Sequence, residues 1–132
     1  MNVLFVCVEN AGRSQIAEAL FTRLAGDRHQ ARSAGSAPAE RIHPQTVDVL
    51  AEAGIRPNGR MPRRLEPSDL AWADVVVTMG CGDACPAIPG KLRADWALPD
   101  VRDATLEETR AIRDEIAARV IELVFELDGG RG

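Results

Sequence analysis

The sequence lacks a long hydrophobic run and a basic leader. Its 132 residues begin Met1-Asn2, without the positively charged region that opens a signal peptide. The first apolar segment, Val3 to Val6, is far shorter than the roughly 20 residues that a membrane-spanning helix needs. We therefore expect a cytoplasmic protein with no membrane partner.

Cysteine is scarce, and its count is odd. The chain has three cysteines, Cys7, Cys81 and Cys85. A set of structural disulfides is not expected in a reducing compartment, and an odd count argues further against simple pairing. The three cysteines are better explained as one nucleophilic cysteine and two partner cysteines than as structural disulfides.

Lysine is nearly absent, since Lys91 is the single lysine among 16 basic residues. The formal net charge is -4. The surface as a whole should therefore repel nucleic acid and acidic membranes. Attraction for a small anionic substrate would have to be local.

The chain is long enough for one domain with a single core, at 132 residues and 45% hydrophobic. We expect this domain over residues 1–127, with a flexible tail over 128–132. Within this domain, the stretch Arg56 to Pro67 holds three prolines and four arginines without periodicity, and it predicts a mobile surface loop.

Apolar strands alternate with amphipathic helices along the chain. This alternation predicts an α/β fold: a doubly wound, mainly parallel four-stranded sheet with helices on both faces. The predicted strands are 2–8, 29–34, 74–79 and 93–96. The first predicted helix ends at Gly26, and its apolar stripe is Ile16, Ala17, Leu20, Phe21 and Leu24. The second runs from Pro44 to Gly54, with Val47 and Leu50 facing inward. The third follows a Thr105–Glu108 capping box, and its inward residues are Ile112, Ile116, Val120, Leu123 and Leu127.

Cys7 ends the first predicted strand, and Arg13 follows six residues later where a helix begins. A loop at this point directs backbone N–H groups inward, the helix N-terminus adds partial positive charge, and Arg13 adds a planar fork of donors. This cradle fits a tetrahedral oxyanion and favours thiolate over thiol. The alternative is a buried structural cysteine with Arg13 in a surface ion pair. The candidate anion-binding residues are Val8, Glu9, Asn10, Ala11, Gly12, Arg13 and Ser14.

A second pair of cysteines, Cys81 and Cys85, follows the strand at 74–79. A metal site is the weaker interpretation, because it would have a single cysteine pair, with His29 and His43 far away in sequence. A redox relay is preferred: one sulfur can attack an adduct on Cys7, and the other can resolve the new disulfide. We expect no metal.

Asp100 lies on the loop after the last predicted strand, at the same edge of the sheet as the two cysteine-bearing loops. A carboxylic acid there could protonate an oxygen that leaves a tetrahedral centre. A solvated aspartate is the alternative. His43 is expected to start a helix, and Trp72 and Trp96 are expected to be packing residues.

Four segments of the sequence form a family pattern. They are Cys7 to Gln15, Ser33 to Gly35, Ala73 to Pro86, and Asp95 to Asp100. Together they resemble the arsenate reductases built on the low molecular weight protein tyrosine phosphatase fold. The block from Met79 to Pro86 is the most specific part, because ordinary phosphatases of this fold lack it.

The resemblance implies a mechanism for arsenic detoxification. The Cys7 thiolate would attack arsenate held by the loop and Arg13, while Asp100 protonates the departing hydroxide. Cys81 would then attack Cys7 and release arsenite. Cys85 would attack Cys81, which leaves a disulfide for thioredoxin to reduce, and no tightly bound cofactor is required.

The sequence departs from the family pattern at the general acid and at the resolving cysteines. Val101 follows Asp100 where the family usually has proline, so Asp95 and Asp103 remain alternatives. Cys81 and Cys85 are closer together than in the known thioredoxin-coupled branch. A related branch uses a small thiol such as mycothiol instead.

Some relatives bind potassium beside the anion loop. Asn10, Glu18 and Ser33 match part of that site, so we consider potassium as a further ligand.

Two other functions compete with arsenate reduction. The first is a low molecular weight tyrosine phosphatase acting on a phosphomonoester, since phosphate and arsenate are nearly isosteric. The chain has no tyrosine and three phenylalanines, so it lacks the aromatic walls of phosphotyrosine-specific relatives. The second is a non-catalytic redox sensor, which would leave Asp100 without a role.

Overall fold

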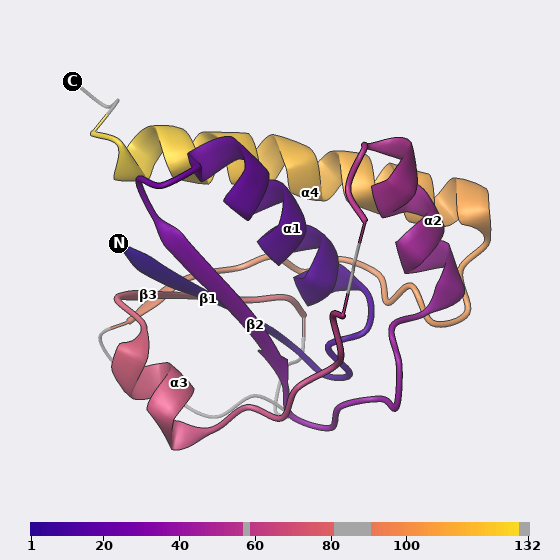
Figure 1. The fold of residues 1–132 in the computed structure, drawn as a ribbon, viewed down its shortest axis with the longest axis horizontal. Coiled ribbons are helices and arrows are strands. Elements are labelled where there is room, and N and C mark those ends of the chain that lie inside the picture. The colour runs from indigo at the N-terminus through magenta and orange to yellow at the C-terminus, as the bar shows by residue number, and fades with distance from the viewer. Residues whose placement is uncertain (57–58, 81–90, 130–132) are drawn as a thin grey trace.

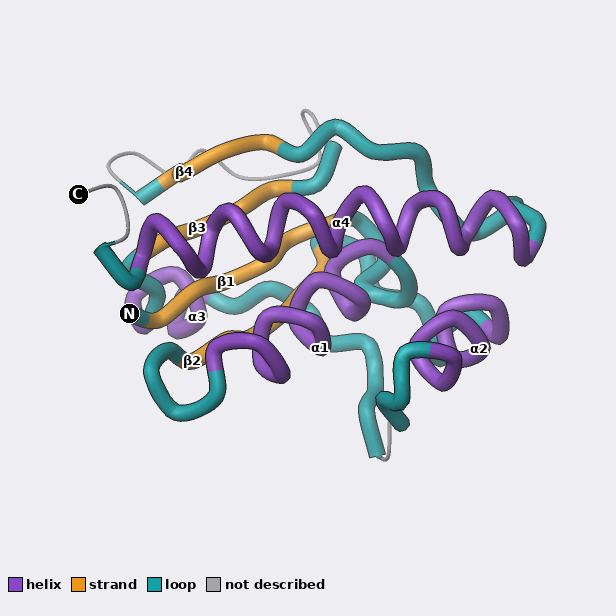
Figure 2. The backbone as a smooth tube through the Cα atoms, turned by 90° about the horizontal axis from the view of Figure 1, so that it is seen from above, coloured by secondary structure: helices purple, strands orange, loops and turns teal. Residues whose placement is uncertain are grey.

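The computed structural model describes residues 1–56, 59–80 and 91–129. Its centre is a parallel sheet with the strand order β2-β1-β3-β4 (Figure 2). All three strand pairs are parallel, as predicted for a doubly wound fold. The strands are β1 (Asn2–Cys7), β2 (Gln30–Gly35), β3 (Val75–Thr78) and β4 (Leu92–Asp95).

Helices cover both faces of this sheet (Figure 1). Helices α1 and α4 lie side by side over one face, α2 packs against them, and α3 covers the other face. No helix of the described ranges is both long and apolar enough to cross a membrane. The helices are α1 (Arg13–Ala25), α2 (Pro44–Glu52), α3 (Pro67–Trp72) and α4 (Leu106–Leu127).

Strand β1 connects the two cores because its side chains alternate between the faces of the sheet. Phe5 and Cys7 face α1 and α4, whereas Leu4 and Val6 face the α3 side. Phe5 packs against Trp96 with ring centroids 5.8 Å apart, which confirms the packing role expected for this tryptophan. Burial on both faces explains why β1 is a continuous apolar run.

The second expected packing residue, Trp72, lies at the end of α3 and packs against the core on that face. The Arg32 guanidinium lies 4.2 Å from the centroid of its ring, in a cation–π contact. The packing prediction is therefore confirmed for both tryptophans.

The capping box at Thr105 is confirmed, since Thr105 Oγ1 accepts from Glu108 N at 3.0 Å and Glu108 Oε1 accepts from Thr105 N at 2.8 Å.

Two side chains that were predicted to face the core do not do so. Leu24 is 42% exposed, because Ala25 closes the buried stripe of α1. Val47 is half-buried, and Val49 is the valine of α2 that enters the core.

The strand order fixes where a ligand can bind. β1 lies between β2 and β3, so the chain adds β2 on one side of β1 and then crosses to the other side to form β3. In open parallel sheets this reversal leaves a crevice at the carboxyl ends of the strands. Cys7 ends β1 at this crevice, and Met79 and Gly80 follow β3 there.

Candidate active site

The Cys7 sulfur lies inside the loop that joins β1 to α1, and Cys7 is 2% exposed. Asn10 N donates to Cys7 Sγ at 3.2 Å, and Ser14 Oγ lies 2.8 Å from the same sulfur. Ser14 Oγ already accepts from Asn10 Nδ2 at 2.7 Å, which leaves the serine hydroxyl hydrogen for the sulfur. Two donors therefore point at Sγ, an arrangement suited to a negatively charged nucleophile.

Asn10 gives this loop its shape. Its φ of 52° lies in the left-handed region, where asparagine is among the few tolerated residues. Asn10 Oδ1 accepts from Arg63 N at 2.8 Å and from Gln15 Nε2 at 3.2 Å. These contacts orient the amide so that its NH₂ group faces Ser14.

Arg13 is buried, with 6% of its side chain exposed. Its Nη1 donates to Met79 O at 2.6 Å and to Leu98 O at 2.9 Å. Its Nη2 lies 3.6 Å from Asp100 Oδ2. The alternative of a surface ion pair is therefore wrong, because the guanidinium links the anion loop to the ends of β3 and β4.

Gly12 is required by the packing of Val101. A Cβ added at Gly12 would lie 2.1 Å from Val101 Cγ2, and Val101 is fully buried. The residue that stands in place of the family's usual proline therefore fills the space over the anion loop.

We expect Gly12→Ala to lower the free energy of unfolding by about 3 kcal/mol, because the clash forces the loop or Val101 to move. Chemical denaturation measures this. Val101→Ala supplies the matched control, since the double variant should be little less stable than Val101→Ala alone. Additive losses in the double variant would show that this contact is not the cause.

Three aspartates were candidates for the general acid. Asp95 Oδ1 accepts from Thr78 Oγ1 at 2.6 Å and from Gly80 N at 3.0 Å, and these two hydrogen bonds lower the pKa of Asp95. Asp95 thus remains ionised and fixes the turn after β3. The Asp103 side chain is 93% exposed. Asp100, 40% exposed and next to Arg13, has the best position to donate a proton.

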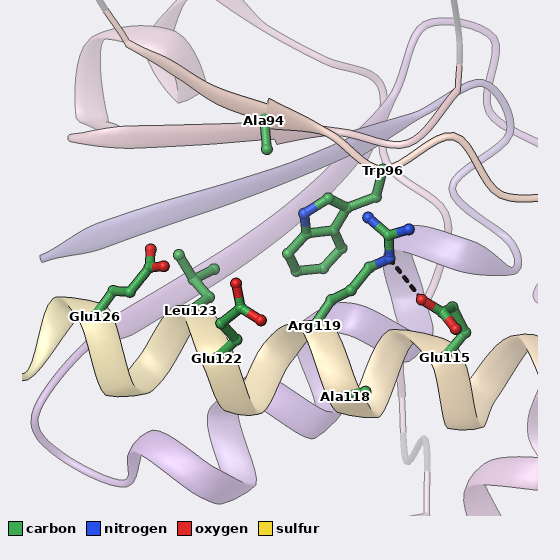
Figure 3. A pocket seen from close by; sticks show the side chains of 8 residues that line it. All are labelled: Ala94, Trp96, Glu115, Ala118, Arg119, Glu122, Leu123 and Glu126. Atoms are coloured by element: carbon green, nitrogen blue, oxygen red, sulfur yellow. Dashed lines mark hydrogen bonds and ion pairs between the residues drawn. The ribbon is translucent and has the colours of Figure 1, made fainter. Parts of the chain in front are cut away.

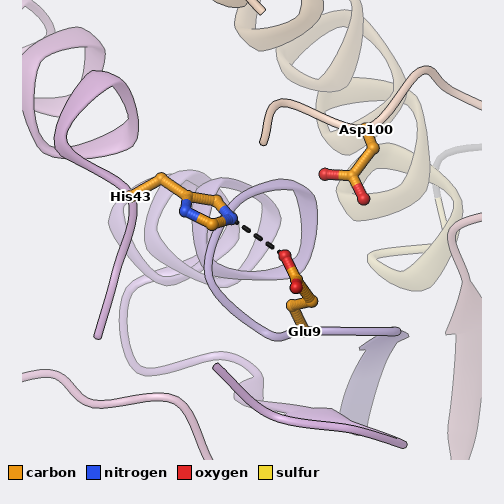
Figure 4. Close-up of side chains that lie close together, drawn as sticks. All are labelled: Glu9, His43 and Asp100. Atoms are coloured by element: carbon orange, nitrogen blue, oxygen red, sulfur yellow. Dashed lines mark hydrogen bonds and ion pairs between the residues drawn. The ribbon is translucent and has the colours of Figure 1, made fainter. Parts of the chain in front are cut away.

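Glu9 and His43 form a pair beside the anion loop (Figure 4). The sequence did not predict this contact. His43 Nε2 lies 3.1 Å from Glu9 Oε1, and Arg102 Nη1 lies 3.3 Å from Glu9 Oε2. His43 does start α2, as predicted, yet its ring faces the anion loop. No local signal could reveal this contact, because 34 residues separate the partners.

Glu9, His43 and Asp100 could each offer one ligand atom to a metal, since these atoms lie within 4.8 Å of one another. Both carboxylates are already next to guanidinium groups, Glu9 by Arg102 and Asp100 by Arg13. These positive charges oppose a cation. We assign no metal to this cluster.

The residues considered for potassium do not fit a resident ion. Ser33 Oγ donates to Glu18 Oε1 at 2.6 Å, and Arg60 Nη1 pairs with Glu18 Oε2 at 3.2 Å. Asn10 Oδ1 is held by Arg63 N at 2.8 Å. Protein donors therefore already serve both Glu18 carboxylate oxygens and Asn10 Oδ1, and the Arg60 charge opposes a cation there.

The stretch 56–67 is predicted to be a mobile surface loop. Its described part is a surface loop, as expected, but it has fixed contacts where mobility was expected. Arg64 forms a parallel bridge with Gly35, and Arg63 contacts Asn10. Pro67 starts α3, after Glu66 has capped this helix. Contacts with β2 and the anion loop therefore order a segment that has no periodicity of its own.

Cys81 and Cys85 lie outside the described residues. The residues just before them are described. Met79 O accepts from Arg13 Nη1. A Cβ added at Gly80 would lie 3.2 Å from Arg13 Nη1. The chain thus reaches Cys81 from a point beside the anion loop.

A separate hollow lies between β4 and α4 (Figure 3). The Arg119 side chain extends toward Trp96 there and pairs with Glu115 at 3.0 Å. The lining includes Glu122 and Glu126 and no residue of the anion loop. Its acidic lining makes it a poor site for an oxyanion.

The sequence matches the family described as low molecular weight phosphotyrosine protein phosphatase over residues 2–130. It is 36% identical to a putative arsenate reductase of Halobacterium salinarum, across 94% of this chain and 91% of that protein. It is 30% identical to a glutaredoxin arsenate reductase of Synechocystis, across 95% of this chain and 97% of that protein.

Among solved structures, a thioredoxin-dependent arsenate reductase of Corynebacterium glutamicum has a TM-score of 0.84 and 42% sequence identity. The match covers 98% of this chain and 63% of that protein, so this chain spans less than two thirds of it. The four-stranded fold and the resemblance to arsenate reductases are both confirmed.

Proposed function

The chain belongs to the low molecular weight phosphotyrosine protein phosphatase family, among its arsenate reductases, and we propose that it reduces arsenate to arsenite through Cys7, Cys81 and Cys85. The observation that carries this proposal is the pair of donors at the Cys7 sulfur, 3.2 Å from Asn10 N and 2.8 Å from Ser14 Oγ. The position of Gly80 beside Arg13 supports the participation of Cys81, which follows it directly.

The first step forms a bond between sulfur and arsenic. The Cys7 thiolate attacks arsenate(V), which is bound by the N–H groups of residues 8–14 and by Arg13. One arsenate hydroxyl leaves as water after Asp100 gives it a proton. Asp100 suits this role because its carboxyl group is partly exposed and lies 3.6 Å from Arg13 Nη2, at the rim of the loop.

The second step transfers two electrons. The Cys81 thiolate attacks Cys7 Sγ, so a Cys7–Cys81 disulfide forms and the sulfur–arsenic bond breaks. Arsenic keeps the electron pair of that bond and leaves as arsenite(III). The Cys85 thiolate then attacks Cys81 Sγ, which returns Cys7 as a thiolate and leaves a Cys81–Cys85 disulfide.

The last step needs a thiol reductant. The named relatives include a thioredoxin-dependent and a glutaredoxin arsenate reductase. We favour thioredoxin, because the two resolving cysteines lie within the chain and present it with a disulfide. This chemistry suits the reducing cytoplasm. A small thiol such as mycothiol would instead act directly on the arsenic adduct of Cys7.

A coupled assay tests the proposed function. Thioredoxin, thioredoxin reductase and NADPH are added to the protein, and NADPH consumption is followed with and without arsenate. We expect consumption that depends on arsenate and produces one arsenite per NADPH. Hydrolysis of p-nitrophenyl phosphate without any arsenate-dependent consumption would instead assign the site to a phosphomonoesterase.

Asp100→Asn tests the general acid. We expect kcat to fall by about 10²-fold or more, because the amide cannot supply the proton, with a smaller change in KM. Asp103→Asn is the matched control, since its side chain lies at the surface, and it should retain wild-type kcat. A kcat loss in Asp103→Asn equal to that in Asp100→Asn would contradict the assignment.

A further inference from the structure

Glu18 is a carboxylate held just behind the anion loop. It extends from α1 toward β2, where Ser33 Oγ donates to its Oε1 at 2.6 Å. Its side chain is 21% exposed, so water compensates its charge only in part. Arg60 Nη1 pairs with Glu18 Oε2 at 3.2 Å, and the Arg60 side chain is itself mostly covered.

The Arg63 guanidinium connects β2 to α3. Its Nη1 donates to Ser33 O on β2 at 2.7 Å, and its Nη2 pairs with Asp69 Oδ1 on α3 at 2.8 Å. Asp69 is fully buried. Burial alone would raise the pKa of Asp69, but the hydrogen bonds from Arg63 and from Glu66 N outweigh it and lower the pKa. The Arg63 guanidinium is thus anchored to a buried, charged carboxylate.

These contacts lead to the reactive sulfur. Arg63 N donates to Asn10 Oδ1 at 2.8 Å, and Asn10 Nδ2 donates to Ser14 Oγ at 2.7 Å. Ser14 Oγ lies 2.8 Å from Cys7 Sγ. A shift of the segment that carries Arg60 and Arg63 would therefore move the Asn10 amide and with it a donor to Cys7.

We propose that Arg60 and Arg63 act as built-in cations that brace the back of the anion loop, so that this protein needs no monovalent metal ion there. The Arg60 guanidinium balances the Glu18 charge. The Arg63 guanidinium, held by Ser33 O and Asp69, fixes the position of the Arg63 backbone N–H that binds Asn10 Oδ1. Both are positioning residues. The proposal depends on the proposed function only in taking the Cys7 loop as the oxyanion site.

Inorganic phosphate is the probe, and its Kd is measured by calorimetry with the full chain in KCl and in choline chloride at equal ionic strength. Thermal unfolding is recorded in both salts. Neither measurement needs arsenate turnover, so failure of the proposed function and failure of this proposal give different results. Wild type should show the same phosphate Kd and the same melting temperature in both salts.

Arg60→Met removes the cation and keeps most of the side-chain volume. We expect phosphate binding in choline chloride to weaken by about tenfold, as for loss of a supporting partner behind a ligand site. Potassium should recover part of this loss, and Arg60→Lys should retain wild-type binding. Adding Glu18→Gln to Arg60→Met should remove the potassium response, because the carboxylate is then gone.

Arg64→Met is the matched control on the same segment, since the Arg64 guanidinium reaches Ser36 O at 3.4 Å, outside this cluster. It should bind phosphate as wild type does. Two results would overturn the proposal: a phosphate Kd of wild type that is several-fold tighter in KCl than in choline chloride, or an Arg60→Met variant that binds phosphate as tightly as wild type in choline chloride.

Discussion

Replacing Cys7 by serine should abolish arsenate reduction and leave phosphate binding almost unchanged. A serine hydroxyl is a far weaker nucleophile than a thiolate, and arsenite release requires a sulfur that can enter a disulfide. We expect arsenate-dependent NADPH consumption to fall by at least about 10⁴-fold, as for loss of a covalent nucleophile. The coupled assay measures this directly.

The same variant should retain its oxyanion site because serine preserves the hydrogen-bonding pattern of the loop. An oxygen can still accept from Asn10 N, and the contacts of Arg13 with Met79 O and Leu98 O do not involve residue 7. Calorimetry with phosphate is the control. Arsenite production by Cys7→Ser at a rate near wild type would exclude Cys7 as the nucleophile.

The second large effect concerns the resolving cysteines. Cys81→Ser and Cys85→Ser should each stop repeated turnover with thioredoxin, but at different stages. Cys81→Ser should release no arsenite, because nothing attacks the Cys7 adduct. Cys85→Ser should release one arsenite per chain and then stop as a Cys7–Cys81 disulfide. Rapid quench with arsenite quantification, and a gel without reductant, separate the two stages.

Other outcomes would assign the reductant differently. Full turnover of Cys85→Ser with thioredoxin would show that Cys85 has no required role. Full turnover of both variants with a small thiol alone would move the protein to the mycothiol-type branch. Wild type itself is the control in the thioredoxin assay, since it should consume NADPH continuously.

The sheet and the anion loop could be predicted from local sequence. An apolar run buried on both faces, as in β1, has few alternatives to a central parallel strand. The interval from Cys7 to Arg13 then specifies a loop and a helix start, because this short segment must turn from the sheet edge into α1. Helix α4 carried a complete cap and a regular stripe.

The polar contacts around the loop could not be predicted, because they join distant segments. Glu9 meets His43, and Glu18 meets Arg60, only after the sheet has brought their loops together. Single charged residues in a chain with 16 basic and 20 acidic residues carry no information on partners.

Helix α3 was missed for a different reason. Its six residues are too few to show a helical stripe. A signal was present: Glu66 and Asp69 have the spacing of a capping box, and Pro67 occupies the first helical position. Leu24 misled because its spacing fits the stripe of α1, whereas the smaller Ala25 takes the buried position at the end of the helix.

Mass mapping of disulfides after a single arsenate turnover tests the central claim most directly. Fully reduced protein is mixed with excess arsenate in the absence of any reductant, alkylated and digested. We predict a Cys81–Cys85 disulfide, an alkylated Cys7 and one arsenite per chain. Arsenite release that leaves Cys81 and Cys85 both alkylated would contradict the relay, and so would the absence of any arsenite.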